Sequence, residues 1–183
     1  MAFWEKPHVA FTVDYGQLPA LGEIRAAQQI TRALGIEHIV IQHDCSALGS
    51  GDLAGVPPSE HAQASDWWPY RNQLLTTLVA AKAIGIGVGE LIIGTVRTDA
   101  IHADGTAAFI EAMDRLLSIQ EGHMRVVAPA IEFSCAELIR ISGIPRELLA
   151  WAHSCHVSEF ACGQCRGCNK HREAMRELGY ESY

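Results

Sequence analysis

The sequence contains no long apolar run. No uninterrupted hydrophobic stretch in its 183 residues approaches the roughly 20 residues of a membrane-spanning helix. Residues 1–7 also lack the apolar segment of a secretory signal peptide. We therefore expect a cytoplasmic protein that does not insert into a membrane, in a compartment that keeps its thiols reduced.

An excess of positive charge is also absent. Lysine and arginine total 14 against 21 acidic residues, which gives a formal net charge of −7. General electrostatic attraction to nucleic acid or to an anionic membrane is therefore not expected. With 49% hydrophobic and 19% charged residues, the composition is typical of a folded globular protein. The length predicts a single domain over residues 1–183.

Cysteine is concentrated near the C-terminal end. Four of the six cysteines follow a C-x6-C-x2-C-x2-C pattern. Two consecutive Cys-x2-Cys steps turn successive thiolates toward one point, and the glycines at 163 and 167 relieve the strain of tight turns. Four thiolates around a tetrahedral centre suit a structural Zn2+ ion. We therefore predict a zinc loop over residues 155–168, with the ligands Cys155, Cys162, Cys165 and Cys168.

Other interpretations of these cysteines are open. A disulfide pair is opposed by the absence of a secretory signal. An iron–sulfur cluster also takes four thiolates at short spacings, and chance clustering of inert cysteines is a further alternative. His153 or His156, which flank Cys155, could replace one thiolate. His102, His153, His156 and Asp104 could also form a catalytic metal site, although scattered histidines are more often hydrogen-bonded loop residues.

Hydrophobic periodicity predicts an α/β fold. Residues 8–13 and 38–42 have the pattern of buried strands, and the helical spacing of residues 21–34 joins them into a β-α-β unit with parallel strands. Two further strands are predicted at 90–95 and 125–128. Together these strands predict a parallel, Rossmann-like sheet with helices on both faces, and the remaining helices are predicted at 71–84, 106–121, 134–142, 145–150 and 169–178.

Polar clusters follow the predicted strands. They are residues 14–17, the pair Arg71 and Asn72, and residues 97–104. In α/β sheets, ligands bind beyond the carboxyl ends of the strands. Each cluster alone is accounted for by turn or cap chemistry, but the three together favour a binding site. Trp67 and Trp68 could stack on a purine ring or pack beneath the irregular stretch 45–68.

Four segments carry a family resemblance. In chain order they are FTVDYGQ at 11–17, WPYRNQLL at 68–75, IIGTVRTDAIHADGTAAFIEAM at 92–113 and SCHVSEFACGQCRGC at 154–168. Together they resemble the 7-cyano-7-deazaguanine synthase family. This family belongs to the PP-loop ATP pyrophosphatase group and acts in queuosine and related deazapurine pathways. The resemblance covers nearly the whole chain and implies an adenine nucleotide alpha hydrolase-like fold.

The resemblance implies an ATP-dependent ligase. Its expected reaction converts 7-carboxy-7-deazaguanine and ammonia into the nitrile, with ATP and Mg2+ as cofactors and the four cysteines as zinc ligands. A homodimer is expected on the same basis. Arg71 would contact an anionic group, while Asn72 and Gln17 would offer amide hydrogen bonds. No catalytic residue is identified. The expected substrate- and nucleotide-binding residues are Asp14, Tyr15, Gln17, Arg71, Asn72 and Asp104.

The sequence also departs from the family pattern. The family's phosphate loop, Ser-Gly-Gly-x-Asp-Ser after the first strand, is absent from these 183 residues. Its strand is expected at the centre of the sheet, between residues 8–13 and 90–95. We therefore expect the chain to be N-terminally incomplete and to bind ATP weakly or not at all. The alternative is a non-catalytic zinc-bearing α/β binding module. Residues 101–105 replace the family's Tyr-Pro-Asp-Cys-Arg segment, so a relative that acts on another deazapurine, or that modifies a protein, is a further alternative.

Overall fold

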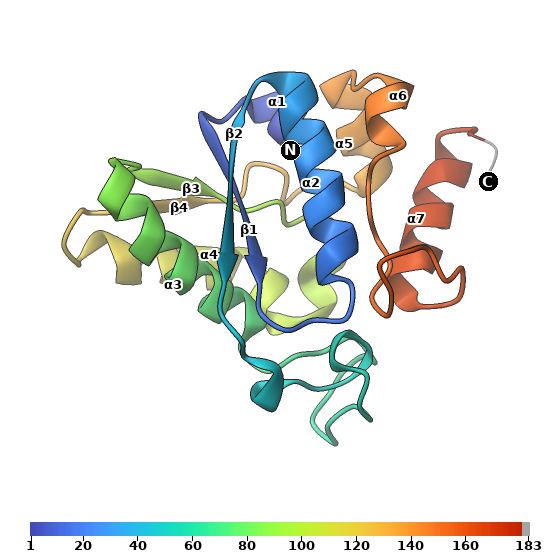
Figure 1. Cartoon of the computed structure of the whole chain (residues 1–183), viewed down its shortest axis with the longest axis horizontal. Helices are drawn as coiled ribbons and strands as arrows, with labels where there is room; N and C mark the ends of the chain where they lie inside the picture. Colours follow the sequence, from blue (N-terminus) through green and yellow to red (C-terminus); the bar gives the residue numbers. More distant parts are fainter. Residues whose placement is uncertain (181–183) are drawn as a thin grey trace. The chain divides into compact units, whose positions relative to one another are not determined.

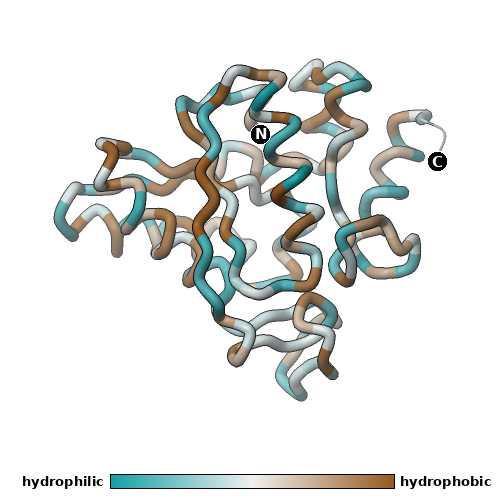
Figure 2. The backbone as a smooth tube through the Cα atoms, viewed as in Figure 1, coloured by the Kyte–Doolittle hydropathy of each residue, from teal (hydrophilic) through white to brown (hydrophobic). Residues whose placement is uncertain are grey.

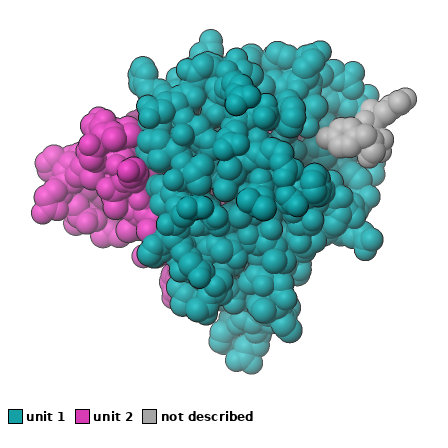
Figure 3. All heavy atoms as spheres, in the orientation of Figure 1, with its two compact units in different colours: residues 1–69, 139–183 teal, residues 70–138 magenta. Residues whose placement is uncertain are grey.

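The computed structural model describes residues 1–180. The chain divides into two compact units (Figures 1 and 3). The first unit contains residues 1–69 and the chain from residue 139 onward, and the second contains residues 70–138. Each unit is a mixture of helices and parallel strands, which confirms the predicted α/β class. The single domain over residues 1–183 stays a prediction.

The first unit is built on one β-α-β crossover. Strands β1 (Val9–Asp14) and β2 (Glu37–Gln42) pair in parallel, and helix α2 (Ala20–Leu34) connects them. Strand β2 is apolar over its middle residues, Ile39–Ile41, and polar at both ends (Figure 2). Helix α2 ends at Gly35, whose φ of 66° is the left-handed conformation that glycine adopts without strain. The predicted β-α-β unit is confirmed.

Short helices complete the first unit. Two 3-10 helices, Ser46–Leu48 and Asp52–Ala54, interrupt the stretch predicted to be irregular. The unit also contains the helices α1 (Ala2–Glu5), α6 (Arg146–Leu149) and α7 (Arg166–Glu177), while α5 (Cys135–Ser142) includes residues of both units. Helix α7 begins three residues before the predicted start at residue 169. The reason is that the Cys165 sulfur accepts the Cys168 N–H at 3.5 Å and caps the helix.

The second unit contains a smaller parallel pair. Strands β3 (Glu90–Ile92) and β4 (Arg125–Val127) pair in parallel; helix α3 (Arg71–Ala83) precedes β3, and helix α4 (Ala107–Ser118) lies between the two strands in sequence. Strand β3 is shorter than the predicted span 90–95. It ends early because the Val96 N–H donates to the Asp99 carboxylate at 2.9 Å, which turns the chain into the 3-10 helix Arg97–Ile101.

The core of the second unit lies between α4 and its strands. Ile110, Met113 and Leu117 recur at helical spacing on one side of α4 and are buried, as are Leu91 of β3 and Val126 of β4. This stripe packs α4 against β4. The predicted amphipathic helix is therefore confirmed, with its N-cap at Thr106, whose hydroxyl accepts the Phe109 N–H at 3.3 Å.

The four strands form two separate pairs and not one continuous sheet. Among the described residues, β1 pairs only with β2, and β3 pairs only with β4. None of the described helices has the length and apolar content needed to cross a membrane.

Candidate functional site

The four cysteines of the zinc loop form a tight cluster. Their sulfurs all lie within 4.8 Å of one another, with 3.9 Å between Cys162 and Cys168 and 3.9 Å between Cys155 and Cys165. A tetrahedral ion with bonds of about 2.3 Å to sulfur has S–S edges of about 3.8 Å. Two of the separations match this edge, so the donor set suits a single metal ion.

The same distances decide between the other interpretations. A disulfide requires sulfurs about 2.05 Å apart, and all six cysteines are free thiols. An iron–sulfur cluster distributes its thiolates over several iron atoms, whereas four sulfurs this close together surround one ion. Neither His153 nor His156 joins the set of ligand atoms. The geometry thus favours one ion held by four thiolates.

Backbone N–H groups point at the sulfurs. Gln164 and Cys165 donate to Cys162 at 3.4 and 3.3 Å, and His156 donates to Cys165 at 3.3 Å. The hydrogen bonds from Gln164 and Cys165 lower the pKa of the Cys162 thiol to about 6. Burial raises the pKa of Cys168 to about 12. Because a metal ion must displace the protons from all four thiols, metal affinity is expected to fall as the solution becomes acidic.

Two glycines give the loop its shape. Gly163 has a φ of 75°, which confirms the tight turn predicted between Cys162 and Cys165. Gly167 acts differently, because a Cβ there would lie 1.8 Å from the Ser154 carbonyl oxygen and 2.7 Å from the His156 ring. The start of α7 therefore passes so close to the backbone near Cys155 that only glycine fits.

Helix α2 directly contacts residues 155–168, which hold the four cysteines and are called the cysteine loop from here on. The Arg25 guanidinium pairs with the Glu159 carboxylate at 2.7 Å and lies 5.0 Å from the centre of the Phe160 ring. One turn earlier, a Cβ on Gly22 would lie 2.6 Å from the Glu159 carbonyl oxygen. The close approach at Gly22 and the Arg25 contacts together hold residues 159–160 against α2.

A second contact joins the cysteine loop to residues 45–69, here called the 45–69 segment. Asp66 of this segment is buried, and its carboxylate lies 3.4 Å from Arg166 Nε and 3.5 Å from His156 Nδ1. His156 therefore faces a carboxylate in this structure. Trp68 of the same segment is 2% exposed and packs its ring against Tyr15 with centroids 4.9 Å apart.

The predicted binding residues after β1 form a closed loop. Gln17 is buried, its amide oxygen accepts the Tyr15 N–H at 2.8 Å, and its amide nitrogen donates to Val13 O at 3.1 Å and to Glu23 at 2.8 Å. The Asp14 carboxylate accepts the Gly16 N–H at 3.3 Å. In this structure the Gln17 amide therefore holds the loop together, and its hydrogen bonds stay within the protein.

Three predicted binding residues meet in the second unit. Asp104 accepts the backbone N–H of Asn72 at 3.3 Å, and its own carbonyl oxygen accepts the Asn72 side-chain amide at 3.1 Å. Arg71 is half-buried at the first position of α3, with its Nε 3.5 Å from the Asn72 amide oxygen. Residues 32 positions apart are thus brought to the N-terminal end of one helix.

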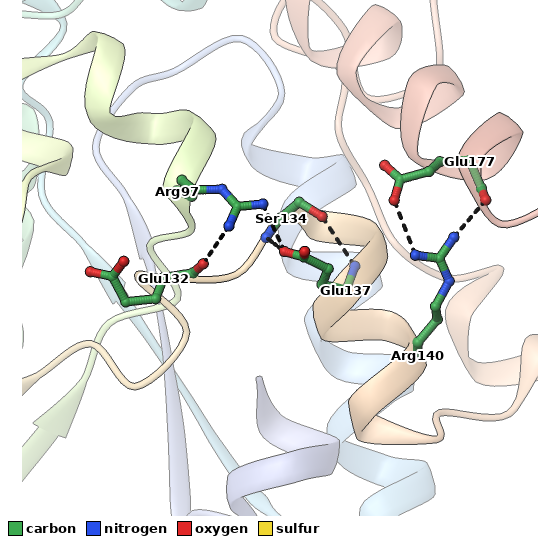
Figure 4. A network of polar contacts seen from close by, with 6 residues as sticks. All are labelled: Arg97, Glu132, Ser134, Glu137, Arg140 and Glu177. Carbon is green, nitrogen blue, oxygen red and sulfur yellow. Dashed lines mark hydrogen bonds and ion pairs between the residues drawn. The ribbon is translucent and has the colours of Figure 1, made fainter.

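The loop after β3 is anchored by its other polar residues. Arg97 donates to the Glu132 carbonyl oxygen at 2.9 Å and to the Glu137 carboxylate at 2.8 Å (Figure 4). Glu137 and Ser134 form the predicted capping box of α5, with bonds of 2.7 and 3.2 Å. Farther along α5, Arg140 separately pairs with Glu177 of α7 (Figure 4). Arg97 therefore anchors its loop in this structure.

The six predicted binding residues are divided between the units. Asp14, Tyr15 and Gln17 belong to the first unit, and Arg71, Asn72 and Asp104 belong to the second. The sequence did not predict a role for Asp66, because His156 and Arg166 lie about a hundred residues later in the chain and no local pattern indicates these contacts.

Comparison with known proteins gives one consistent result. The family model described as "Queuosine biosynthesis protein QueC" matches residues 5–179. A 7-cyano-7-deazaguanine synthase of Desulforudis audaxviator (strain MP104C) is 32% identical over 194 residues, covering 93% of this chain and 86% of that protein. Proteins of the same name from Anaeromyxobacter dehalogenans (strain 2CP-C) and Methanothermobacter thermautotrophicus are 33% and 30% identical. Those alignments cover 93% and 94% of this chain and 81% and 85% of the relatives.

Proposed function

Because this chain belongs to the family of the queuosine biosynthesis protein QueC, we propose that it is a 7-cyano-7-deazaguanine synthase acting in queuosine biosynthesis. The observation that carries the proposal is the family match over residues 5–179, which spans both compact units and includes the four-cysteine cluster. The substrate would be 7-carboxy-7-deazaguanine, with ammonia as the nitrogen donor and ATP as the activating reagent.

The chemistry explains why ATP is needed. A carboxylate is a poor electrophile, because oxide would have to leave. Attack of a carboxylate oxygen on the α-phosphorus of ATP releases pyrophosphate and forms an acyl-adenylate, from which AMP leaves readily. Ammonia then displaces AMP and gives the amide. The amide oxygen then attacks the α-phosphorus of a second ATP, which releases pyrophosphate and a proton, and loss of AMP and the remaining N–H proton gives the nitrile. The protein must therefore bind two anionic partners and hold them in line.

Arg71, Asn72 and Asp104 would form the anion-binding part of the site. Arg71 begins the 13-residue helix α3, whose N-terminal end carries partial positive charge. Its guanidinium would bind the substrate carboxylate or an ATP phosphate through charge-assisted hydrogen bonds. Asp104 would act by holding Asn72, since both of its contacts to that residue order the first turn of α3.

The loop after β1 would supply the shape of the base-binding part. Gln17 holds the Tyr15 backbone in place, so the loop is ordered before a ligand arrives. Among the described residues, the four cysteines are the one group of three or more potential ligands close enough together to hold a metal ion. Mg2+ would therefore arrive on the ATP phosphates, where it offsets their charge, with Asp14 or Asp104 as the protein carboxylate.

Zinc is the ion proposed for the cysteine cluster. Four thiolates at tetrahedral separations fit Zn2+ and leave no position open for a substrate, so its role would be structural. The thiolates of Cys155 and Cys168, both buried, would be held by the loop and by the start of α7.

The test is product formation by the purified 183-residue chain. With 7-carboxy-7-deazaguanine, ammonium, ATP and Mg2+, a synthase forms the nitrile, detected by mass spectrometry, with two AMP released for each nitrile. Because the sequence predicts weak ATP binding, the nitrile is expected only at a high ATP concentration. A catalyst that acts on a related deazapurine would release AMP with that base and not with 7-carboxy-7-deazaguanine.

The second candidate is a non-catalytic, zinc-bearing binding module. It is favoured by the absence of the Ser-Gly-Gly-x-Asp-Ser segment from these 183 residues. Isothermal titration separates the two. The synthase requires measurable binding of ATP with Mg2+, whereas the module would bind the deazapurine base but not ATP and would release no AMP.

A further inference from the structure

A buried carboxylate lies between the cysteine loop and the 45–69 segment. Only 10% of the Asp66 side chain is exposed, and Arg166 and His156, which lie 3.4 and 3.5 Å from its carboxylate, both belong to the cysteine loop. We propose that Asp66 is a positioning residue through which the metal-loaded cysteine centre holds the 45–69 segment in place. The inference rests on the cysteine cluster binding a metal ion and is independent of the nitrile-forming reaction.

The partners of Asp66 are the sequence neighbours of metal ligands. Arg166 follows Cys165, and His156 follows Cys155. An ion held by the cysteines therefore fixes the backbone from which both partners extend. The His156 N–H also donates to the Cys165 sulfur at 3.3 Å, which ties the His156 backbone to the cluster itself. Loss of the ion would release both partners of the buried carboxylate together.

From Asp66 the contacts continue into the segment. Its neighbour Ser65 accepts the Asp52 N–H at 2.8 Å and donates its hydroxyl to the Asp52 carboxylate at 2.7 Å. A Cβ on Gly51 would lie 2.0 Å from the Ser65 carbonyl oxygen, so the two sides of the segment touch there. Fixing Asp66 thus fixes the segment at a second point, about fifteen residues earlier in the chain.

On its other side, Asp66 leads to a proposed binding residue. Trp68, two residues later, is fully buried and meets the ring of Tyr15 edge-on, with centroids 4.9 Å apart and planes at 82°. Tyr15 is one of the residues proposed to shape the base-binding loop. Two residues of chain therefore connect Asp66, which contacts the cysteine loop, to Trp68, which contacts the loop after β1, and all of these residues lie within the first unit.

Helix α2 holds the cysteine loop by separate contacts. The Arg25 guanidinium reaches Glu159 and Phe160 and makes no described contact with Asp66. Neutralising Asp66 should therefore release the 45–69 segment while the cysteine loop stays on α2 and keeps its ion. This combination distinguishes a positioning role from a general loss of folding.

The experiment is hydrogen exchange followed by mass spectrometry on the zinc-loaded full chain, before and after removal of zinc with a chelator. The variants are Asp66→Asn and, as the matched control, Glu60→Gln, which removes an equal charge from a side chain of the same segment that is 87% exposed. Arg166→Gln tests the same contact from the opposite side and serves if Asp66→Asn does not fold.

The effects of Asp66→Asn and of zinc removal on amide exchange are expected not to add. In zinc-loaded Asp66→Asn, amides of the 45–69 segment exchange at least about tenfold faster than in the wild type, with one zinc still bound. Chelation produces a similar acceleration in the wild type and in Glu60→Gln, but adds little in Asp66→Asn. Equal acceleration by chelation in the wild type and in Asp66→Asn would overturn the proposal, as would wild-type exchange in zinc-loaded Asp66→Asn. A wild-type chain without stoichiometric zinc overturns it together with the metal assignment, whereas a zinc-loaded chain without nitrile synthesis leaves it standing.

Discussion

Arg71 lies where a single charge can be removed without disturbing the core. Its side chain is half-buried, and its described contact is a long one to the neighbouring Asn72. We expect Arg71→Ala to weaken binding of the carboxylate substrate or of ATP at least about tenfold, because a charge-assisted hydrogen bond contributes roughly 1.5–3 kcal/mol. Titration calorimetry measures this change. Lys82→Ala, which removes the same charge from the exposed last turn of α3, should leave both affinities unaltered. Equal affinities in wild type and Arg71→Ala would remove Arg71 from the site.

Substituting Gly167 tests how closely the start of α7 packs against the backbone near Cys155. A methyl group there would overlap the Ser154 carbonyl oxygen at 1.8 Å, and backbone cannot move aside as a flexible side chain can. We expect Gly167→Ala to bind well below one zinc per chain and to lose about 2 kcal/mol or more of stability. Metal analysis and thermal unfolding measure these two quantities. Gly89→Ala, at a glycine with open space around it, is the control. Full zinc occupancy in Gly167→Ala would show that the loop has another arrangement.

Single residues differ in how far the sequence could place them. The cysteine cluster was predictable, because three ligands lie within seven residues and their spacing alone brings the sulfurs together. The pairing of Asn72 with Asp104 was partly predictable, since both follow predicted strands or begin helices. Gln17 stays a predicted binding residue, and its amide hydrogen-bonds with the Tyr15 N–H and with Glu23 of α2, which no local pattern indicates. Asp66 could not be found, because a buried long-range ion pair leaves no local pattern.

At the scale of elements, α4 is attached to β4 by one carboxylate. Asp114 accepts two hydrogen bonds from the Arg125 guanidinium, at 2.8 and 3.0 Å, and one from the Val126 N–H at 2.8 Å. The hydrogen bond from Arg125 is the largest cause that lowers the pKa of Asp114 below its ordinary value of 3.8. The carboxylate therefore contributes stability above about pH 4, and this contribution is lost as the pH falls through the lowered pKa.

Asp114→Asn should remove this pH-dependent contribution. At neutral pH we expect a loss of about 1 kcal/mol, because Arg125 is largely exposed and the pair is screened by solvent. As the pH falls below 4, the unfolding free energies of wild type and variant should converge. Urea unfolding at pH 7 and pH 3 measures both values, with Glu111→Gln on the exposed side of α4 as the control. A difference between wild type and Asp114→Asn that is equal at both pH values would contradict the assignment.

Elements were predicted well where one physical signal decides them. Apolar periodicity and Gly35 placed α2, and the Ser134–Glu137 capping box placed α5. The predicted ends of elements were wrong where a side-chain hydrogen bond to the backbone, and not the apolar periodicity, sets the end of the element. Strand β3 stops early because Asp99 captures the Val96 N–H, and α7 starts early because a cysteine sulfur caps it. Cysteine is not among the residues that usually cap helices, so capping rules do not predict the start of α7.

At the scale of the whole molecule, the two parallel strand pairs differ in length. The β1–β2 pair aligns six residues on each strand, whereas β3–β4 aligns three. Parallel strands usually belong to larger sheets covered on both faces, and an unpaired backbone group costs roughly 1–3 kcal/mol when it is buried. The sequence predicted parallel pairing but not its division into two sheets, because strand periodicity carries no information about which edges meet.

All the metal ligands belong to one unit, and this has a measurable consequence. The contacts described around the cysteine loop, those to Gly22, Arg25 and Asp66, also lie in the first unit. A bound metal ion stabilises the part of the fold that contains its ligands, because binding requires that part to be folded. On chelation we therefore expect faster amide exchange in residues 139–180 and 1–69, and little change in residues 70–138. Peptide-resolved hydrogen exchange of the wild type measures this difference, and readdition of zinc should reverse it. Equal acceleration across residues 70–138 would show that the metal stabilises the two units as one cooperative structure.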